Sequence, residues 1–166
     1  MAGTDAPAGT GRRRRMTVRE LAIWRALIET TAELSRILSA QLQESGLSAA
    51  DYQVLLALTE AEGRQLRSAQ LATAIDWERS RLSHHLGRME RRGLIGRSGC
   101  ATDNRGAEIS LTPAGARAFR AASVPHLRAI KEHFADALTP DQFDALDGIL
   151  RALDRHLHGH PHWEQP

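Results

Sequence analysis

Hydroxyl, imidazole and guanidinium side chains gather in one short stretch, RSRLSHHLGRMERRG, at residues 79–93. Leu82, Leu86 and Met89 recur at i, i+4 and i+7, which predicts a helix with one apolar, core-facing side. At about 100° per residue, the opposite side carries six polar side chains: Ser80, Arg81, Ser83, His84, Arg88 and Arg91. Arginine can bond O6 and N7 of guanine together, serine can bond a base or a phosphate, and further arginines neutralise phosphates. We therefore expect this helix to contact DNA in the major groove.

A shorter helix is predicted just before it, at residues 68–75, and the turn Asp-Trp-Glu joins the two. Asp76 in that turn has a short carboxylate side chain and is the predicted N-cap of the second helix. Gly93 suits the left-handed position that ends a helix. Two helices joined by a tight turn, the second with a polar outer side, are typical of a DNA-binding helix-turn-helix.

Two extended segments follow at residues 94–100 and 107–111, and the polar residues between them have turn chemistry. They predict a β-hairpin beside the helix-turn-helix, which makes the unit a winged helix. Arg105 at the tip of this wing is predicted to enter the minor groove, where the negative potential is strong. Asp103 is expected to brace the tip or to pair with an arginine of the preceding helix.

A long amphipathic helix is predicted before this unit, at residues 17–44, because apolar residues recur there every three or four positions. Gly46 is expected to end it. Ser48 and Asp51 form the pattern of a capping box, which predicts the start of another helix that runs to about residue 60. Leu66 marks a short strand before the helix-turn-helix.

Two further helices are predicted after the wing. The first begins at Thr112 and Pro113, runs to about residue 138 and contains Pro125, which is expected to kink it. The second begins with a cap at Thr139 and carries an apolar stripe to Leu157. These helices and the first one have more apolar surface than the winged helix can cover.

The predicted fold class is therefore mainly α with a small β-hairpin wing (α+β), a winged helix-turn-helix flanked by N- and C-terminal dimerisation helices. A two-fold homodimer would bury those helices and place two recognition helices about 34 Å apart on a pseudo-palindrome. We expect a disordered basic arm at residues 1–16, one domain at 17–158 and a frayed histidine-containing tail at 159–166. Within the domain, the winged helix covers about 48–112, and the dimerisation helices cover 17–45 and 113–158.

The charge of the chain is unevenly distributed. Residues 64–105 hold nine arginines and four acidic residues, a net charge of +5, whereas the remaining 13 basic and 16 acidic residues sum to −3. A basic lobe on an otherwise acidic chain indicates double-stranded DNA as the partner. The single cysteine and the lack of a signal peptide or of a long apolar run favour the cytoplasm, without membrane attachment.

Histidines in the tail, a cysteine and a run of arginines near the N-terminus could also be functional. The tail holds alternating histidines at 156, 158, 160 and 162, but no carboxylate or cysteine stands at a recognised metal-ligand spacing, so no metal and no cofactor is predicted. Cys100 is either an inert strand residue or a redox-sensitive thiol. The four arginines at 12–15 either touch the DNA backbone or have no fixed partner. No nucleophile, base and acid set is found, and we predict that the protein is not an enzyme.

The runs RSRLSHHLGRMERRGLI and TDNRGAEISLTPAG resemble the multiple-antibiotic-resistance regulator (MarR) family. The resemblance covers roughly residues 18–157, and its most specific part is Asp103-x-Arg105 followed by Leu111-Thr112. It implies a dimeric, ligand-responsive transcriptional regulator, with a recognition helix at residues 79–92 and a wing arginine at Arg105. Trp77 and Glu78 depart from the smaller residues expected before that helix.

Two functions of different classes follow. The first is a sequence-specific transcriptional regulator, with repression favoured because a protein on a promoter excludes polymerase. The resemblance implies release by a small, often aromatic ligand, for which Trp24, Ile28 and Tyr52 are the candidate pocket residues; the simpler interpretation makes Trp24 and Tyr52 core or dimer contacts. The alternative is an architectural protein that binds duplex DNA without sequence preference.

Overall fold

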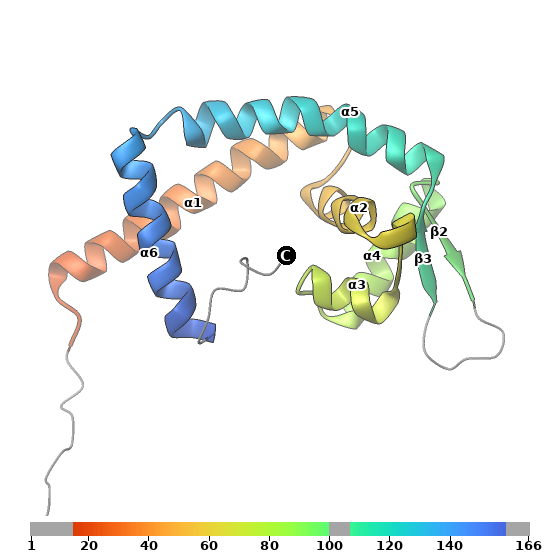
Figure 1. Ribbon diagram of the computed structural model, residues 1–166, viewed down its shortest axis with the longest axis horizontal. Helices are drawn as coiled ribbons and strands as arrows, with labels where there is room; N and C mark the ends of the chain where they lie inside the picture. Colours follow the sequence, from red (N-terminus) through yellow and green to blue (C-terminus); the bar gives the residue numbers. More distant parts are fainter. Residues whose placement is uncertain (1–14, 100–106, 159–166) are drawn as a thin grey trace, which may run out of the picture. The chain divides into compact units, whose positions relative to one another are not determined.

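The computed structural model describes residues 15–99 and 107–158 (Figure 1). Most of the predicted basic arm, Cys100, the wing tip with Asp103 and Arg105, and the tail from residue 159 lie outside this range. The chain divides into two compact units, with the boundary inside the first helix between Glu33 and Leu34. All of the DNA-binding candidates in the described range belong to the second unit.

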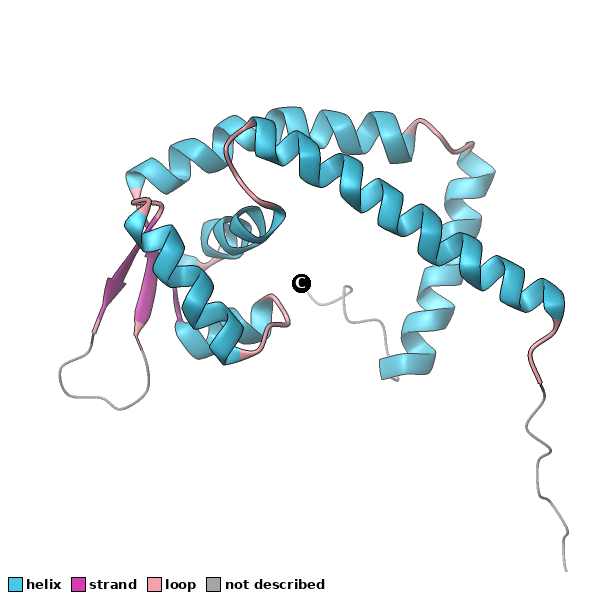
Figure 2. Cartoon of the chain, turned by 180° about the vertical axis from the view of Figure 1, so that it is seen from behind, coloured by secondary structure: helices cyan, strands magenta, loops and turns pink. Residues whose placement is uncertain are grey.

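The fold is mainly α-helical with a small three-stranded antiparallel sheet, as predicted (Figure 2). Before the helix-turn-helix come α1 (Val18–Glu44), α2 (Ala49–Glu60), the 3₁₀ turn η1 (Glu62–Arg64) and β1 (Gln65–Arg67). The helix-turn-helix is α3 (Ser68–Ala74) and α4 (Arg79–Arg91), and β2 (Ile95–Ser98) and β3 (Glu108–Leu111) form the wing. The chain continues through α5 (Pro113–Ile130), the π-helical turn η2 (Lys131–Ala135) and α6 (Pro140–His158). No helix in the described ranges is long and apolar enough to cross a membrane.

Side-chain caps fix where several helices start. At α2, the backbone N–H of Asp51 donates to Ser48 Oγ at 3.1 Å, and the Ser48 N–H donates to Asp51 Oδ2 at 2.9 Å, so the predicted capping box is confirmed. At α5, the Gly115 N–H donates to Thr112 Oγ1 at 2.9 Å, and Pro113 occupies the first helical position. Thr139 caps α6 in the same way.

The turn between α3 and α4 differs from the prediction. Asp76 is not the N-cap of α4; that position belongs to Glu78, which makes no side-chain cap bond. Asp76 instead has a φ of 51°, in the left-handed region that aspartate tolerates better than most residues. The chain needs this conformation to reverse after α3, where the Trp77 N–H donates to the Ala72 carbonyl at 2.9 Å.

Both wing strands begin one residue later than predicted, β2 at Ile95 and β3 at Glu108. Leu94 is not part of β2, because its N–H donates to the Met89 carbonyl and closes the end of α4 at Gly93, whose φ is 69°. In the hairpin, Ile95 pairs with Leu111 and Ser98 with Glu108. The predicted strand at Leu66 is present and pairs with β3, which lies between β1 and β2 in the sheet.

Pro125 lies inside α5, as predicted, but the departure from α-helical geometry comes later, at η2. There the Asp136 N–H donates to the Lys131 carbonyl at 2.8 Å, five residues back, as in a π-helix. The start of α5 is fixed against the wing by Gly115, where a Cβ atom would lie 2.0 Å from the Leu94 carbonyl oxygen. Only glycine permits this approach of α5 to the hairpin.

The core is aliphatic, in agreement with the low aromatic content of the sequence. Its largest fully buried side chains come from α2, α3, α4, β3 and the segment before α2: Leu47, Val54, Leu55, Leu58, Leu71, Leu82, Leu86, Met89 and Ile109. Leu82, Leu86 and Met89 are the predicted apolar side of α4. Because this side is anchored in the core, the opposite side of α4 faces outward.

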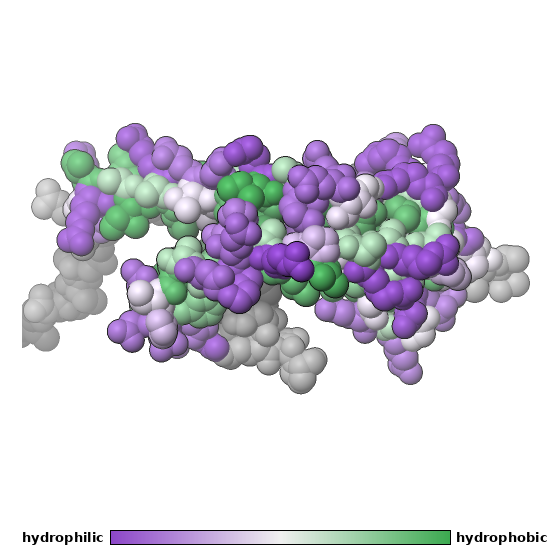
Figure 3. Space-filling view, turned by 90° about the horizontal axis from the view of Figure 1, so that it is seen from above, coloured by the Kyte–Doolittle hydropathy of each residue, from purple (hydrophilic) through white to green (hydrophobic). Residues whose placement is uncertain are grey.

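Other apolar side chains stay exposed on the remaining helices, and Figure 3 shows hydrophobic patches among hydrophilic ones on one face of the molecule. In the first unit they lie on α1 and include Ile23, Trp24, Leu27 and Ile28. In the second unit they lie on α5 and α6 and include Val124, Leu127, Phe143, Ile149, Leu150, Leu153 and Leu157. Each unit thus presents apolar surface that the described chain leaves uncovered.

Candidate nucleic-acid interface

The outer side of α4 carries every predicted DNA-binding residue of that helix. Six exposed side chains follow one another along it: Ser80, Arg81, Ser83, His84, Arg88 and Arg91. The inner side buries Leu82, Leu86 and Met89, and also His85. Hydroxyl and guanidinium groups at the surface of a firmly packed helix can bond base edges and phosphates.

A buried carboxylate connects the inner side of α4 to α2. Asp51 is only 2% exposed, and its Oδ2 accepts a hydrogen bond from Arg92 Nη1 at 2.7 Å. Arg92 also donates to the Gly46 carbonyl at 2.7 Å, which ties the end of α4 to the segment before α2. Burial raises the pKa of Asp51, but the Ser48 N–H and the Arg92 guanidinium lower it more, so the pKa lies below its ordinary value and the carboxyl group is ionised.

His85 occupies the space between this carboxylate and the outer side of α4. Its Nε2 lies 3.1 Å from Asp51 Oδ1, close enough for an ion pair if the ring is protonated but off the direction of a good hydrogen bond. Its Nδ1 lies 2.8 Å from Arg88 Nη2. Burial lowers the pKa of His85, Asp51 raises it, and Arg88 and Arg92 lower it further, so the pKa lies below its ordinary value.

Trp77, the residue that departs from the family pattern, supports Arg81. The Arg81 guanidinium carbon lies 4.2 Å from the centre of the Trp77 ring, a cation–π contact. The Trp77 ring meets His85 edge-on, with ring centres 5.3 Å apart. Arg81 and Arg88 are seven residues apart, so they share one flank of α4; Arg81 stacks on the Trp77 ring, whereas Arg88 bonds to a ring nitrogen of His85.

Arg97 joins the wing to α4. Its Nη2 donates to the Ser83 carbonyl at 3.0 Å, and its Nε lies 3.4 Å from Glu90 Oε2. This contact fixes β2 beside the DNA-binding helix (Figure 1). The predicted roles of Asp103 and Arg105 lie beyond the described part of the hairpin.

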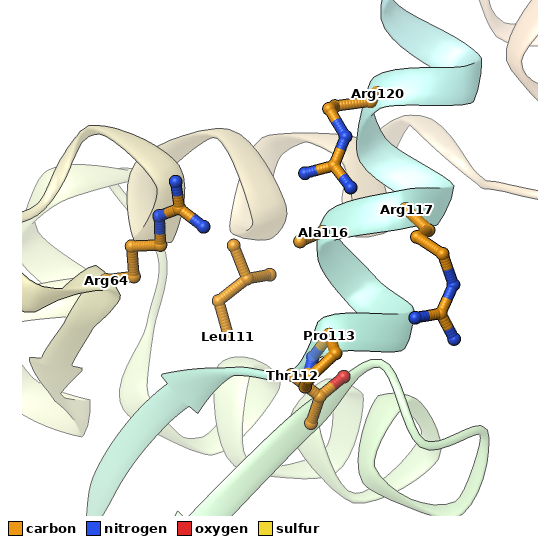
Figure 4. A pocket seen from close by; sticks show the side chains of 7 residues that line it. All are labelled: Arg64, Leu111, Thr112, Pro113, Ala116, Arg117 and Arg120. Atoms are coloured by element: carbon orange, nitrogen blue, oxygen red, sulfur yellow. The ribbon is translucent and has the colours of Figure 1, made fainter.

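A basic pocket of about 340 Å³ lies where β3 meets α5. Its guanidinium groups come from Arg64, Arg117 and Arg120, and in Figure 4 Arg64 and Arg120 point toward one another over Leu111, whereas Arg117 points away. Within residues 15–99 and 107–158 the side chains of these three arginines form no hydrogen bond or ion pair. The winged-helix unit therefore carries positive charge beyond the surface of α4.

The three predicted ligand-pocket residues are distributed over both units. Trp24 and Ile28 are exposed on the part of α1 that belongs to the first unit. Tyr52 belongs to the second unit, where its ring packs on Phe119 and His126 and its hydroxyl lies 3.3 Å from Ser123 Oγ. Burial lowers the pKa of His126. Neither unit by itself brings the three together.

A pocket of about 410 Å³ lies near Tyr52, between the second half of α1 and α5. Gln41 lines it, and the Gln41 amide oxygen lies 3.2 Å from His126 Nδ1, so the pocket adjoins the Tyr52 cluster. Pro125 lines it as well. Among the described residues, no group of three histidine, cysteine or acidic side chains could hold a metal ion.

Sequence reasoning found the outer side of α4 but missed the side chains that hold it: Asp51, Trp77, His85, Arg92 and Arg97. One signal was available, because His85 and Arg92 lie seven residues apart on the flank that faces α2. The pairing with Asp51 could not be found from spacing, since 34 residues separate it from His85.

Residues 45–106 match the sequence model of the MarR family. The chain is 37% identical to AbsC, a MarR family transcriptional regulator from Streptomyces coelicolor, over 89% of this chain and 99% of that one, with a TM-score of 0.80. It is 34% identical to Sco3205, another such regulator from the same organism, solved in complex with DNA, over 89% of this chain and 93% of that one, with a TM-score of 0.81. The regulator RdhR-CbdbA1625, solved with bound 2,4-dichlorophenol, shares the fold at 21% identity, 92% and 89% coverage and a TM-score of 0.74.

Proposed function

The chain belongs to the MarR family of transcriptional regulators, and we propose that it binds a pseudo-palindromic operator as a homodimer and represses transcription there. The observation that carries this proposal is the outer side of α4, where six exposed polar side chains stand on a helix anchored in the core. The DNA complex of the 34% identical Sco3205 supports the same partner for this chain. The proposal places the protein in the cytoplasm as a regulator and not an enzyme.

The two DNA-contacting elements are assigned different tasks. Arg81, Ser83 and Arg88, with their neighbours Ser80, His84 and Arg91, contact base edges and phosphates in the major groove, where each base pair has a distinct pattern. Arg105 enters the minor groove from the wing, and Asp103 braces it. Arg97 supports this division because it fixes β2 to α4.

The homodimer is supported by the apolar side chains left exposed on α1, α5 and α6. Trp24 is 53% exposed and Leu157 is 71% exposed, a large amount for aromatic and aliphatic residues on regular helices. A second copy that covers these helices would create two recognition helices one DNA turn apart. Light scattering at micromolar concentration should therefore give the mass of a dimer, and a monomer would contradict the two-half-site arrangement.

We further propose a small aromatic effector that releases the DNA. The 410 Å³ pocket beside Tyr52 and Pro125 has the size of a small-molecule site, and Trp24 and Ile28 are the candidates from the first unit. 2,4-Dichlorophenol, which the distant relative binds, is a suitable first probe. It should raise the melting temperature of the unmodified protein more than that of Tyr52→Ala. An equal rise in both proteins would show that Tyr52 is not part of the binding site.

The alternative function is an architectural protein that binds DNA without sequence preference, and a competition assay separates the two. Operator candidates are first selected from genomic fragments with the purified protein. A regulator should then bind its selected site at least about 10³-fold more tightly than random DNA at one stated salt concentration. A ratio near one would favour the architectural protein.

A further inference from the structure

The flank of α4 that carries Arg88 also contains a buried histidine. His85 is 6% exposed, and Arg88 Nη2 lies 2.8 Å from its Nδ1. An arginine nitrogen can only donate, so His85 Nδ1 must accept and therefore has no proton. The proton of the neutral ring is then on Nε2, which faces the Asp51 carboxylate at 3.1 Å. The contact with Arg88 thus selects one neutral tautomer, whose Nε2 is beside the Asp51 carboxylate.

Arg88 is turned toward its own helix by this arrangement. One terminal nitrogen contacts the His85 ring, and the other lies 3.5 Å from the His84 carbonyl oxygen. Both of its terminal nitrogens are therefore directed at the protein. The contact with His85 engages one of the two N–H groups on Nη2, so the Arg88 guanidinium has to leave His85 before all the donors of both terminal nitrogens can face a guanine or a phosphate.

We infer that His85 is a positioning residue for Arg88, which holds the guanidinium on α4 when the ring is neutral and releases it to DNA when the ring gains a proton. A protonated ring has an N–H on both nitrogens, so Nδ1 can no longer accept from Arg88. The new charge also repels the guanidinium. Asp51 remains beside Nε2 and stabilises the charged ring, so protonation leaves His85 with a partner.

The charged groups around the ring oppose one another. Asp51 on α2 favours the protonated ring, whereas Arg88 and Arg92 on α4 disfavour it. From the α3–α4 turn, Trp77 contributes an uncharged ring edge with Arg81 on its surface. Operator DNA brings phosphates toward Arg88 and adds negative charge, which favours protonation of His85 in the complex.

This inference rests on the proposed function and predicts how operator affinity changes with pH. Between pH 7.5 and pH 6.0 the affinity should rise about threefold to tenfold, because one hydrogen bond between Arg88 and a neutral ring no longer has to be broken. The rise should keep its size in His84→Gln, a comparison variant that removes the neighbouring exposed histidine and, because His84 is a proposed DNA contact, lowers the affinity at every pH. The rise in affinity should be absent in Arg88→Ala, because that variant has no guanidinium for His85 to hold or release.

His85→Gln gives a second test. The glutamine amide can accept from Arg88 and cannot gain a proton in this range, so its affinity should stay at the high-pH value throughout. A rise of full size in Arg88→Ala, or a flat profile in His84→Gln, would overturn the inference. Circular dichroism at each pH checks that every variant remains folded.

The DNA-free protein supplies a test that does not depend on the operator. Nitrogen-15 NMR of the histidine rings at pH 7.5 should show His85 with its proton on Nε2, and Arg88→Ala should raise the pH at which the ring titrates. A proton on Nδ1 would contradict the inference. If no variant bound any site selectively at either pH, the proposed function would fail, and the NMR result would still decide whether His85 holds Arg88.

Discussion

The two sides of α4 hold their charged groups in opposite ways. On the inner side, the buried Asp51 carboxylate contacts both His85 and Arg92. On the outer side, Arg81 and Arg88 are exposed; the Arg81 guanidinium stacks on Trp77, and the Arg88 guanidinium bonds to His85 Nδ1. The difference indicates that the inner side determines the stability of the unit and the outer side its affinity for DNA. Substitutions on the inner side should therefore change the free energy of unfolding, and substitutions on the outer side should change the free energy of DNA binding.

The largest effect on stability is expected at Asp51. Asp51→Ala removes the carboxylate from the capping box of α2 and leaves Arg92 and His85 without their partner. The free energy of unfolding should fall by about 2–4 kcal/mol, less than for a fully buried pair because the Arg92 side chain is 45% exposed. Urea denaturation measures it. The control Asp144→Ala removes an exposed carboxylate and should change little, and an equal loss in both would refute the role of the inner side.

Substitution on the outer side should have the opposite profile. Arg81→Ala, and Arg88→Ala at pH 6.0, should weaken operator binding by about 1–3 kcal/mol and leave the free energy of unfolding within about 0.5 kcal/mol. Fluorescence anisotropy and urea denaturation on the same preparations measure both quantities. A stability loss comparable with that of Asp51→Ala would mean that the two sides are not separable.

Acid should destabilise the fold through its buried histidines, His85 on the inner side of α4 and His126 on α5. Burial lowers the pKa of both His85 and His126 below the ordinary 6.5. In the window between the lowered and the ordinary pKa the unfolded chain binds more protons than the folded one, so stability is present above pH 6.5 and is lost as the pH falls through the folded-state pKa. The urea midpoint should be lower at pH 5.5 than at pH 7.5, and His126→Gln should reduce that difference. An unchanged difference would show that His126 does not contribute to it.

The smallest effect is expected at the contact between α4 and the wing. Glu90 is exposed and lies 3.4 Å from Arg97, a partly exposed pair of the kind that contributes little. Glu90→Gln should lower the free energy of unfolding by less than about 0.5 kcal/mol. Arg97→Ala should cost more, because it also removes the hydrogen bond to the Ser83 carbonyl. Equal effects would show that this hydrogen bond adds nothing.

Local patterns in the sequence predicted most of the fold. The capping box at Ser48 and Asp51, the left-handed Gly93 and the strand at Leu66 all depend on residues close together in the chain. Asp76 was misassigned because aspartate suits both an N-cap and a left-handed turn, and only the three-dimensional path after α3 decides between them. The start of β2 was misplaced because Leu94 completes the helix before it.

The candidate site was only half predictable for a related reason. The outer side of α4 follows from the helical period of Leu82, Leu86 and Met89, which assigns the opposite side to solvent. The inner network depends on Asp51, which the fold brings to α4 from a distant part of the sequence. Trp77 looked like a departure from the family pattern, and its use as a surface for Arg81 emerges only from the packing.

The central claim is that the outer side of α4 recognises the base sequence of the operator. It is tested most directly by binding-site selection at pH 6.0 with the unmodified protein and with Arg81→Ala, Arg88→Ala and Arg105→Ala, each at two salt concentrations. We predict that the two α4 variants lose base preference at one position in each half-site, whereas Arg105→Ala keeps the selected sequence and shows a weaker dependence on salt. If both α4 variants selected the unchanged sequence and Arg105→Ala altered its central bases, recognition would belong to the wing and the claim would be wrong.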